Sequence, residues 1–286
     1  MNIGVIGGSG LYQLKDGGLA QSIEVATPYG PPSGPVYKSD NGGHSLFFLA
    51  RHGVGHVHTP TEINYRANIF ALKKLGAEMV VSVSAVGSLR QEIEPGDLVL
   101  PEQYIDLTRG IRVGSFFGNG VVGHAHFSDP TCESLRNHIA QVCEDMKVKV
   151  HRGGTYVCIE GPHFSTRAES HLYRSWKIPK NEISVIGMTA MPEAKLAREA
   201  GLCYQTVAMA TDYDCWNEEG EAVTVEAVMR VLGQNVNTSR NLIAKLSAST
   251  IPPCRSGCQH VMKNAVMTAP EHWPENRKEE LQVILR

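Results

Sequence analysis

Short apolar runs alternate with amphipathic stretches along this chain, and each run ends in small, polar or charged residues. The first run, Ile3 to Ile6, is followed at once by the turn Gly7-Gly8-Ser9-Gly10. Such alternation is typical of an α/β fold, in which helices connect and cover the strands of a central sheet. Because ligands bind at the carboxyl ends of strands in these sheets, the residues that end each run are the candidate functional residues.

The clearest helix prediction is the segment 59–76, where both the start and the end carry recognisable residues. Thr59 and Glu62 have the spacing of a capping box, Pro60 suits the first turn, and Gly76 is a natural residue after the last turn. The other predicted elements are strands at 45–50, 79–83 and 203–210 and helices from 129, over 192–200 and over about 225–247.

Composition excludes several classes of protein. The 286 residues include 27 Lys and Arg against 29 Asp and Glu, so the formal net charge is −2 and gives no overall field for nucleic acid or an anionic membrane. No apolar run approaches the roughly 20 residues of a membrane span. The N-terminus lacks the basic start and long apolar stretch of a secretory signal, so a cytoplasmic location is expected. Polar, Pro-containing sequence after the last helix predicts a body, 1–248, and a loosely packed C-terminal tail, 249–286.

Seven cysteines are spread over the chain, which is not the pattern of a disulfide framework. Cys254 and Cys258 are the only close pair. Their spacing is not that of a zinc knuckle, and no second Cys or His pair lies beside them in the sequence. We therefore expect two ordinary thiols and no metal, with a local disulfide as the alternative.

Groups suited to an anion follow three of the predicted strands. The Gly-Gly-Ser-Gly turn offers backbone N–H groups, but the third glycine and the crossover helix of a dinucleotide-binding fold are missing. Arg51 and His52 follow the strand at 45–50, and the arginine fork matches phosphate geometry. The small residues at 84–88 let backbone amides and the Ser84 hydroxyl approach a ligand. Each signal alone is also consistent with an ordinary strand-to-loop turn, and for a lone arginine an exposed loop position is the favoured interpretation.

Two acidic residues, Asp212 and Asp214, follow the predicted strand at 203–210. If they share a pocket, they will not both ionise readily, so one could donate a proton while the other accepts a hydrogen bond. A solvated acidic loop is the alternative interpretation.

In this order, eight segments resemble the 5′-methylthioadenosine phosphorylases of the purine nucleoside phosphorylase superfamily: IGGSG, LARHG, NYRANIFALK, SAVGSLR, PGD, IEGPHFSTRAES, GMTAMPEAKLAREAG and MATDYDCW. The resemblance runs from Gly4 to about Ala244. It implies a single α/β domain with a mixed central β-sheet flanked by helices, and a homotrimer. The implied reaction is phosphorolysis of S-methyl-5′-thioadenosine to adenine and 5-methylthioribose 1-phosphate, a glycosyl transfer of purine and methionine salvage. Inorganic phosphate is then the co-substrate, with no cofactor and no metal.

The resemblance also implies roles for individual residues. Phosphate would be bound by Ser9, Arg51, His52, Ser84, Ala85 and Thr189. The nucleoside would be contacted by Phe164, Met188, Asp212 and Asp214, the two aspartates being catalytic. Specificity would come from Ser165, Val225, Val228 and His124, the last reaching into a neighbouring subunit's site. The chain departs from the family's usual Arg and Asn at His163 and Gly187.

Two other functions fit the same pocket. A methylthioinosine or broad purine nucleoside phosphorylase would share the phosphate residues, although enzymes for 6-oxopurines commonly carry Asn where this chain has its aspartates. A nucleotide-binding sensor would use the pocket without turnover, and the acid pair argues against it.

Overall fold

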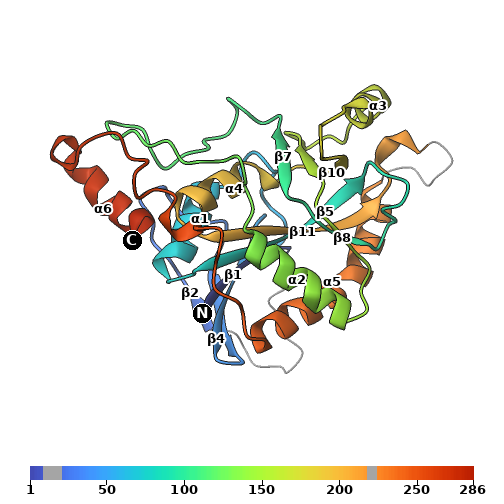
Figure 1. Cartoon of the computed structure of the whole chain (residues 1–286), viewed down its shortest axis with the longest axis horizontal. Helices are drawn as coiled ribbons and strands as arrows, with labels where there is room; N and C mark the ends of the chain where they lie inside the picture. The colour runs from blue at the N-terminus through green and yellow to red at the C-terminus, as the bar shows by residue number, and fades with distance from the viewer. Residues whose placement is uncertain (9–20, 218–223) are drawn as a thin grey trace.

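The computed structural model describes residues 1–8, 21–217 and 224–286. Within them, 11 strands form one sheet, with helices around it (Figure 1). The strands are β1 (Asn2–Gly7), β2 (Gln21–Ile23), β3 (Val36–Asn41), β4 (His44–Ala50), β5 (Met79–Ser88), β6 (Leu98–Leu100), β7 (Gln103–Asp106), β8 (Val150–Arg152), β9 (Thr155–Cys158), β10 (Ile183–Gly187) and β11 (Cys203–Asp212). The helices are α1 (Tyr65–Lys74), α2 (Glu133–Asp145), α3 (Arg167–Ser175), α4 (Ala190–Glu199), α5 (Val225–Ala248) and α6 (Glu275–Leu285), with short 3-10 helices η1 (Asp214–Trp216), η2 (Cys258–His260) and η3 (Pro270–His272).

The central strand of the sheet is β5. Along one edge its first half pairs parallel with β1 and its last two residues pair antiparallel with β10, while β11 runs parallel along the other edge. Beyond β1 lies β4, also parallel. The carboxyl ends of β4, β1, β5 and β11 therefore lie at the same end of the sheet, where α/β proteins bind ligands. The predicted α/β fold with a mixed central sheet flanked by helices is confirmed.

Opposite faces of the sheet form two separate cores. Val80 and Val86 of β5 pack in the core that includes α1, α4 and α6, whereas Met79, Val81 and Val83 pack in the core that includes α2 and α5. Successive residues of a strand point to opposite faces, so a strand covered on both faces needs an uninterrupted apolar run. The apolar start of β5 meets that need.

The helix predicted over 59–76 begins later, at Tyr65. Thr59 and Glu62 do hydrogen-bond as predicted, with the Thr59 N–H donating to Glu62 Oε2 at 2.9 Å, but they close a separate turn. Asn64 caps the helix instead, because its side chain accepts a backbone N–H of the first turn at 3.2 Å. The helix predicted from 129 likewise starts later, at 133.

The C-terminal tail is packed, so the prediction of a loose tail is wrong. Leu281 and Ile284 of α6 are 0% and 1% exposed and belong to the same core as α1. The Arg277 guanidinium, also buried, donates to the backbone carbonyl of Phe116. The division into a body, 1–248, and a tail, 249–286, stays a prediction.

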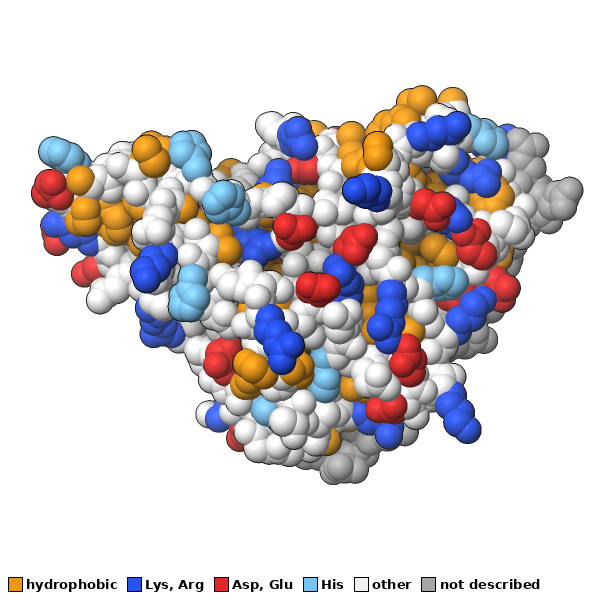
Figure 2. All heavy atoms as spheres, in the orientation of Figure 1, with side chains coloured by type: hydrophobic (Ala, Val, Ile, Leu, Met, Phe, Trp, Pro, Cys, Tyr) orange, Lys and Arg blue, Asp and Glu red, His pale blue; other side chains and the backbone are white. Residues whose placement is uncertain are grey.

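The surface carries both signs of charge. Acidic and basic side chains are interspersed on the face shown in Figure 2, as the near-neutral composition predicts. No helix in the described ranges is both long and apolar enough to span a bilayer.

Candidate active site

The ends of β5, β10 and β11 converge at Gly87. A Cβ on this glycine would lie 3.0 Å from Asp212 Oδ1, 3.1 Å from Ile186 Cγ2 and 3.2 Å from Asp214 Cβ. A residue without a side chain is what allows the three strands to approach so closely. The predicted functional segments after these strands are therefore brought to one place.

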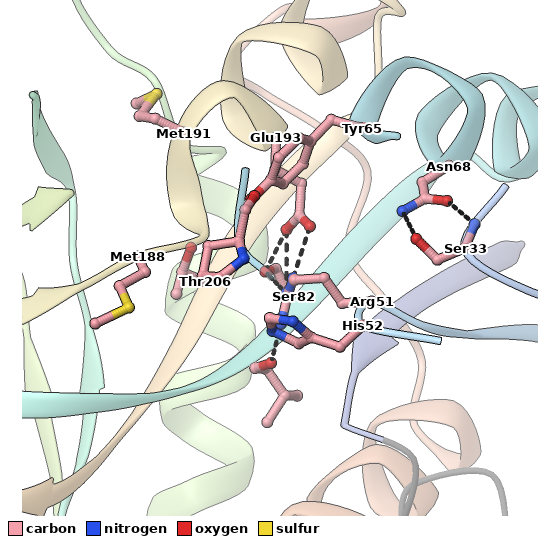
Figure 3. A network of polar contacts seen from close by, with 12 residues as sticks. Ser33, Arg51, His52, Tyr65, Asn68, Ser82, Met188, Met191, Glu193 and Thr206 are labelled. Atoms are coloured by element: carbon pink, nitrogen blue, oxygen red, sulfur yellow. Dashed lines mark hydrogen bonds and ion pairs between the residues drawn. The ribbon is translucent and has the colours of Figure 1, made fainter. Parts of the chain in front are cut away.

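Buried beneath this end of the sheet, Arg51 is only 2% exposed and forms an ion pair with Glu193 (Figure 3). Its Nε donates to Glu193 Oε2 at 3.0 Å, its Nη1 to the Val83 carbonyl at 2.9 Å and its Nη2 to Ser82 Oγ at 2.7 Å. Burial lowers the pKa of Arg51, but the Glu193 carboxylate outweighs burial and the net shift is upward. Nη2 also donates to Glu193 Oε1 at 3.3 Å, so of the five N–H donors one, on Nη1, remains for an anion.

His52, beside it, is neutral near pH 7. Its Nδ1 donates to the His58 carbonyl at 2.8 Å, because a carbonyl only accepts, so the lone pair is on Nε2. Burial lowers the pKa of His52 to about 4, and the Arg51 charge also lowers it. The ring stacks on His56 with centroids 4.1 Å apart. The imidazole therefore offers an acceptor at Nε2, and an arriving anion would favour its protonation.

Two buried hydroxyls lie near one another, Ser84 Oγ in the middle of β5 and Tyr156 Oη in β9. The strand predicted at 79–83 continues to Ser88, so Ser84 lies within the strand and not after it. Within the described residues, neither Ser84 Oγ nor Tyr156 Oη has a hydrogen-bond partner of good geometry. Burial raises the pKa of Tyr156, and the neighbouring Ser84 hydroxyl and Thr189 backbone oppose that shift. Thr189 precedes α4, and its side chain does not cap the helix. Buried hydroxyls without partners are costly, so a ligand that supplies hydrogen bonds here would be stabilised.

Asp212 is the last residue of β11, and Asp214 begins the short helix η1 two residues later. Asp212 accepts a hydrogen bond from the Thr211 hydroxyl at 2.7 Å and from the Asp214 N–H at 2.8 Å. Asp214 is 6% exposed, and its Oδ2 has no partner among the described residues. Burial raises the pKa of both carboxyl groups, and the charge of Asp212 further raises that of Asp214. Asp214 is buried and Asp212 is half-buried, so the interpretation as a solvated acidic loop is wrong.

The loop before α3 carries Phe164 and Ser165 to the two aspartates. The Ser165 carbonyl accepts a hydrogen bond from the thiol of Cys215, which follows the aspartate pair, at 3.1 Å. Ser165 Oγ is buried without a partner among the described atoms, and Phe164 is 45% exposed. Met188 contacts the start of the same loop, since a Cβ on Gly161 would lie 2.5 Å from Met188 Sδ. The loop thus offers an exposed aromatic face and a buried hydroxyl next to the acid pair.

The remaining predicted site residues lie partly in the sheet, partly at the surface and partly outside the described residues. Ala85 is in β5, next to Ser84. His124 is exposed, and its backbone N–H donates to a carbonyl of the tail at 2.8 Å. Ser9 lies outside the described residues. Val225 and Val228 lie in the first turn of α5, and their side chains are outside the described part of the chain.

Sequence reasoning missed two charged side chains that organise the site, the buried Glu193 and the half-buried Arg112. Glu193 holds Arg51 in place through the ion pair. Glu193 lies in the first turn of a predicted helix, directly after the GMT segment, and this position could have identified it from the sequence. Arg112 donates from Nη1 to the carbonyls of Met188 and Met191, each at 2.7 Å, and from Nη2 to the Glu160 carbonyl at 2.5 Å. Arg112 therefore joins the turn before α4 to the loop before α3, and its loop carries no periodic pattern that would have revealed it.

Comparison with known proteins agrees with this geometry. Residues 2–248 match the model of a family described as the phosphorylase superfamily. S-methyl-5′-thioadenosine phosphorylase from Geobacter sulfurreducens is 48% identical over 99% of this chain and 97% of its own length, and the enzyme of the same name from Koribacter versatilis is 45% identical over 99% and 95%. The chain belongs to this superfamily and, within it, to the S-methyl-5′-thioadenosine phosphorylase family.

Solved structures are similar as well. A methylthioadenosine phosphorylase from an antarctic soil metagenomic library has a TM-score of 0.90 and 41% identity, covering 99% of this chain and 98% of that one. The Schistosoma mansoni methylthioadenosine phosphorylase in complex with adenine has a TM-score of 0.81 and 34% identity, covering 87% and 91%.

Proposed function

We propose that this protein catalyses phosphorolysis of S-methyl-5′-thioadenosine, giving adenine and 5-methylthioribose 1-phosphate. The observation that carries the proposal is the acid pair at the end of β11, which packs against Gly87 of β5, the strand that also carries the unpartnered Ser84 hydroxyl. A glycosidic bond can be cleaved by phosphate when an anion site faces one side of the sugar and a proton donor faces the leaving base. The names of the similar enzymes support the same substrate.

On the phosphate side, the proposed residues are Ser9, Arg51, His52, Ser84, the backbone of Ala85 and Thr189. The remaining N–H of Arg51 and the buried hydroxyl of Ser84 supply donors without having to leave other partners. Inorganic phosphate is the co-substrate, and the proposed reaction uses no cofactor or metal. A phosphate oxygen attacks C1′ of the ribose, and the electrons of the C1′–N9 bond pass into the purine.

On the base side, protonated Asp212 donates to N7 of the leaving purine. Its burial supports this role, because burial raises its pKa and so favours the protonated form. Asp214 accepts a hydrogen bond from the exocyclic amine of adenine through its free Oδ2. Phe164 stacks on the base, Met188 lies against the ribose, and Ser165 contributes its hydroxyl at the base.

We extend the proposal to the residues that contact the methylthio group and to the oligomeric state, which we propose is a homotrimer. Val225 and Val228 surround the methylthio group, and His124 of one subunit reaches the site of its neighbour. The exposed side chain of His124, on a loop whose backbone is bound to the tail, suits contact with another subunit.

The mutation His124→Ala should weaken nucleoside use without unfolding the protein, and a fully active monomer in light scattering would contradict the trimer. The cytoplasmic location stays a prediction.

The decisive experiment is a substrate panel of methylthioadenosine, adenosine, methylthioinosine and inosine, each with and without phosphate. We expect adenine release from methylthioadenosine that depends strictly on phosphate. Release at full rate without phosphate would identify a hydrolase. Binding without turnover would identify a sensor, and efficient use of methylthioinosine would favour a broader purine nucleoside phosphorylase.

A further inference from the structure

A cluster of four thiols comes together from three separate parts of the chain, and we call it the four-cysteine cluster: Cys132, Cys203, Cys254 and Cys258. Cys132 precedes α2, Cys203 begins β11, and Cys254 and Cys258 lie in the tail. All four sulfur atoms lie within 4.8 Å of one another. Every thiol of the cluster except the half-buried Cys254 is buried.

The four sulfur atoms are close enough together to share one metal ion. Four thiolates at about 2.3 Å from one Zn²⁺ form a tetrahedron whose edges are about 3.8 Å. The Sγ atoms of Cys132 and Cys254 are 3.8 Å apart, far beyond the roughly 2.05 Å of a disulfide bond. We propose that the four-cysteine cluster binds one Zn²⁺ as a closed structural site, with all four coordination positions filled by the chain.

The surroundings of the cluster suit a negatively charged centre. Arg198 is 7% exposed and directs Nη1 at Cys258 Sγ over 3.7 Å, while its Nε has no partner within the described ranges. Gln259 Nε2 donates to Cys203 Sγ, also at 3.7 Å. Four thiolates and one Zn²⁺ carry a net charge of about −2, which a buried guanidinium and N–H donors to sulfur stabilise. Without such a centre, the only acceptor of the buried Arg198 guanidinium among the described residues is a weak one, the Cys258 thiol.

The site would attach the tail to the body. The Arg255 N–H donates to Ser134 Oγ in the first turn of α2 at 3.0 Å, and Gly257 has the left-handed φ of +66° that turns the chain between the two tail cysteines. Further along the tail, the Ala265 carbonyl accepts the N–H of His124 at 2.8 Å. Zinc at the four-cysteine cluster would therefore hold the segment that supports the His124 loop. Its role is in folding and not in the reaction, so it is compatible with a metal-free phosphorolysis.

The first test is the zinc content of the full-length protein, purified under reducing conditions and passed through a mild chelator. We expect about one zinc per chain, released together with four titratable thiols when a thiol-specific mercurial is added. The variants Cys254→Ser and Cys258→Ser should each lose the bound zinc and lower the Tm. Cys143→Ala is the matched control, because Cys143 is a buried cysteine of α2 outside the cluster, and it should keep its zinc.

A second measurement does not depend on the folding of the variants. Wild-type protein loaded with Co²⁺ should show the intense visible bands and thiolate-to-cobalt charge-transfer absorption of a tetrahedral four-thiolate site. Weak bands typical of six oxygen or nitrogen ligands would overturn the proposal, as would zinc that persists in Cys254→Ser and Cys258→Ser. Two disulfides among the four cysteines, found by mass spectrometry in protein purified with reductant, would also overturn it. None of these outcomes depends on whether the substrate assignment is correct.

Discussion

Gly187 lies against the phenol of Tyr156 so closely that a Cβ at position 187 would be 2.0 Å from Tyr156 Oη and 2.7 Å from Cζ. Tyr156 is fully buried, so its ring cannot move aside into solvent. One space at the end of β10 is thus occupied by a side chain from β9. Any side chain at position 187 would therefore collide with this phenol.

The variant Gly187→Ala should therefore destabilise the protein by about 1–3 kcal/mol, the usual cost of overpacking a core. Combining it with Tyr156→Leu should cost less than the sum of the two single changes, because the second removes the atoms that clash. Urea unfolding of the four proteins measures the coupling. Gly34→Ala is the control, since among the described residues no atom beyond its two chain neighbours lies within 4 Å of the added Cβ. Strict additivity would show that the contact is relieved by other movements.

The ion pair between Arg51 and Glu193 leads to a second prediction. Replacing Glu193 by Gln leaves the Arg51 guanidinium buried without its counter-charge, which should cost about 3–5 kcal/mol of unfolding free energy and raise the KM for phosphate. Glu199→Gln is the matched control. Glu199 is also buried, but burial raises its pKa to about 6, and its donors within the described part of the chain are neutral, the Ser115 hydroxyl and the Phe116 N–H. Chemical denaturation should find Glu199→Gln clearly less destabilising, and equal losses would contradict the importance of the charge pair.

A pH dependence follows from His52, whose pKa burial lowers from 6.5 to about 4. Between these values the unfolded chain binds a proton at this residue and the folded chain does not. The free energy of unfolding should therefore fall as the pH decreases from 6.5 towards 4, by at most about 1.4 kcal/mol per pH unit for this one group. Its contribution is fully present above pH 6.5.

The variant His52→Asn should flatten this slope, because its side chain can still donate to the His58 carbonyl but does not titrate. His171→Asn, at an exposed position of α3, is the control and should keep the wild-type slope. Urea unfolding at a series of pH values measures both. Saturating phosphate should also reduce the slope in the wild type, because a bound anion favours protonated His52. A slope unchanged in His52→Asn would sink the assignment of this pH dependence to His52.

Much of this architecture could be predicted from local sequence, because most strands end where apolar runs give way to glycine and polar residues. Arg51 and Asp212 were identified in this way. The strand predicted at 79–83 is an exception, because β5 continues to Ser88 and the predicted exit residue Ser84 lies within it. The features that could not be predicted are contacts between residues that are far apart in the sequence. The pairing of Arg51 with Glu193 spans 142 positions. The late start of α1 reflects competition between two nearby caps, of which Asn64 is used.

The four-cysteine cluster shows the same limit. Cys132 and Cys254 are 122 positions apart and approach only because α2, β11 and the tail pack together. Local spacing therefore revealed Cys254 and Cys258 as a pair without their partners. The loose tail was predicted from its polarity, and the packing of α6 through Leu281 and Ile284 outweighs that polarity.

The last prediction concerns the base. Asp214 has a buried Oδ2 without a partner among the described residues, and as a carboxylate it can only accept hydrogen bonds. The exocyclic amine of adenine donates to it, whereas a 6-oxopurine presents an oxygen, so two acceptors face each other. A site built around one specific hydrogen bond can reject the mismatched ligand by on the order of 10⁴-fold. We therefore expect a strong preference for methylthioadenosine over methylthioinosine.

The variants Asp214→Asn and Asp212→Asn separate recognition from catalysis. Asp214→Asn can present either an amide donor or an amide oxygen to the base, so it should narrow or reverse the preference while retaining more activity. Asp212→Asn removes the proposed proton donor to N7 and should lower kcat for both nucleosides, by about 10²-fold or more as is usual for a lost general acid. The measurement is kcat/KM for the two nucleosides with the wild type and both variants. Equal use of the 6-amino and 6-oxo substrates by the wild type would contradict the adenine assignment and favour a broad purine nucleoside phosphorylase.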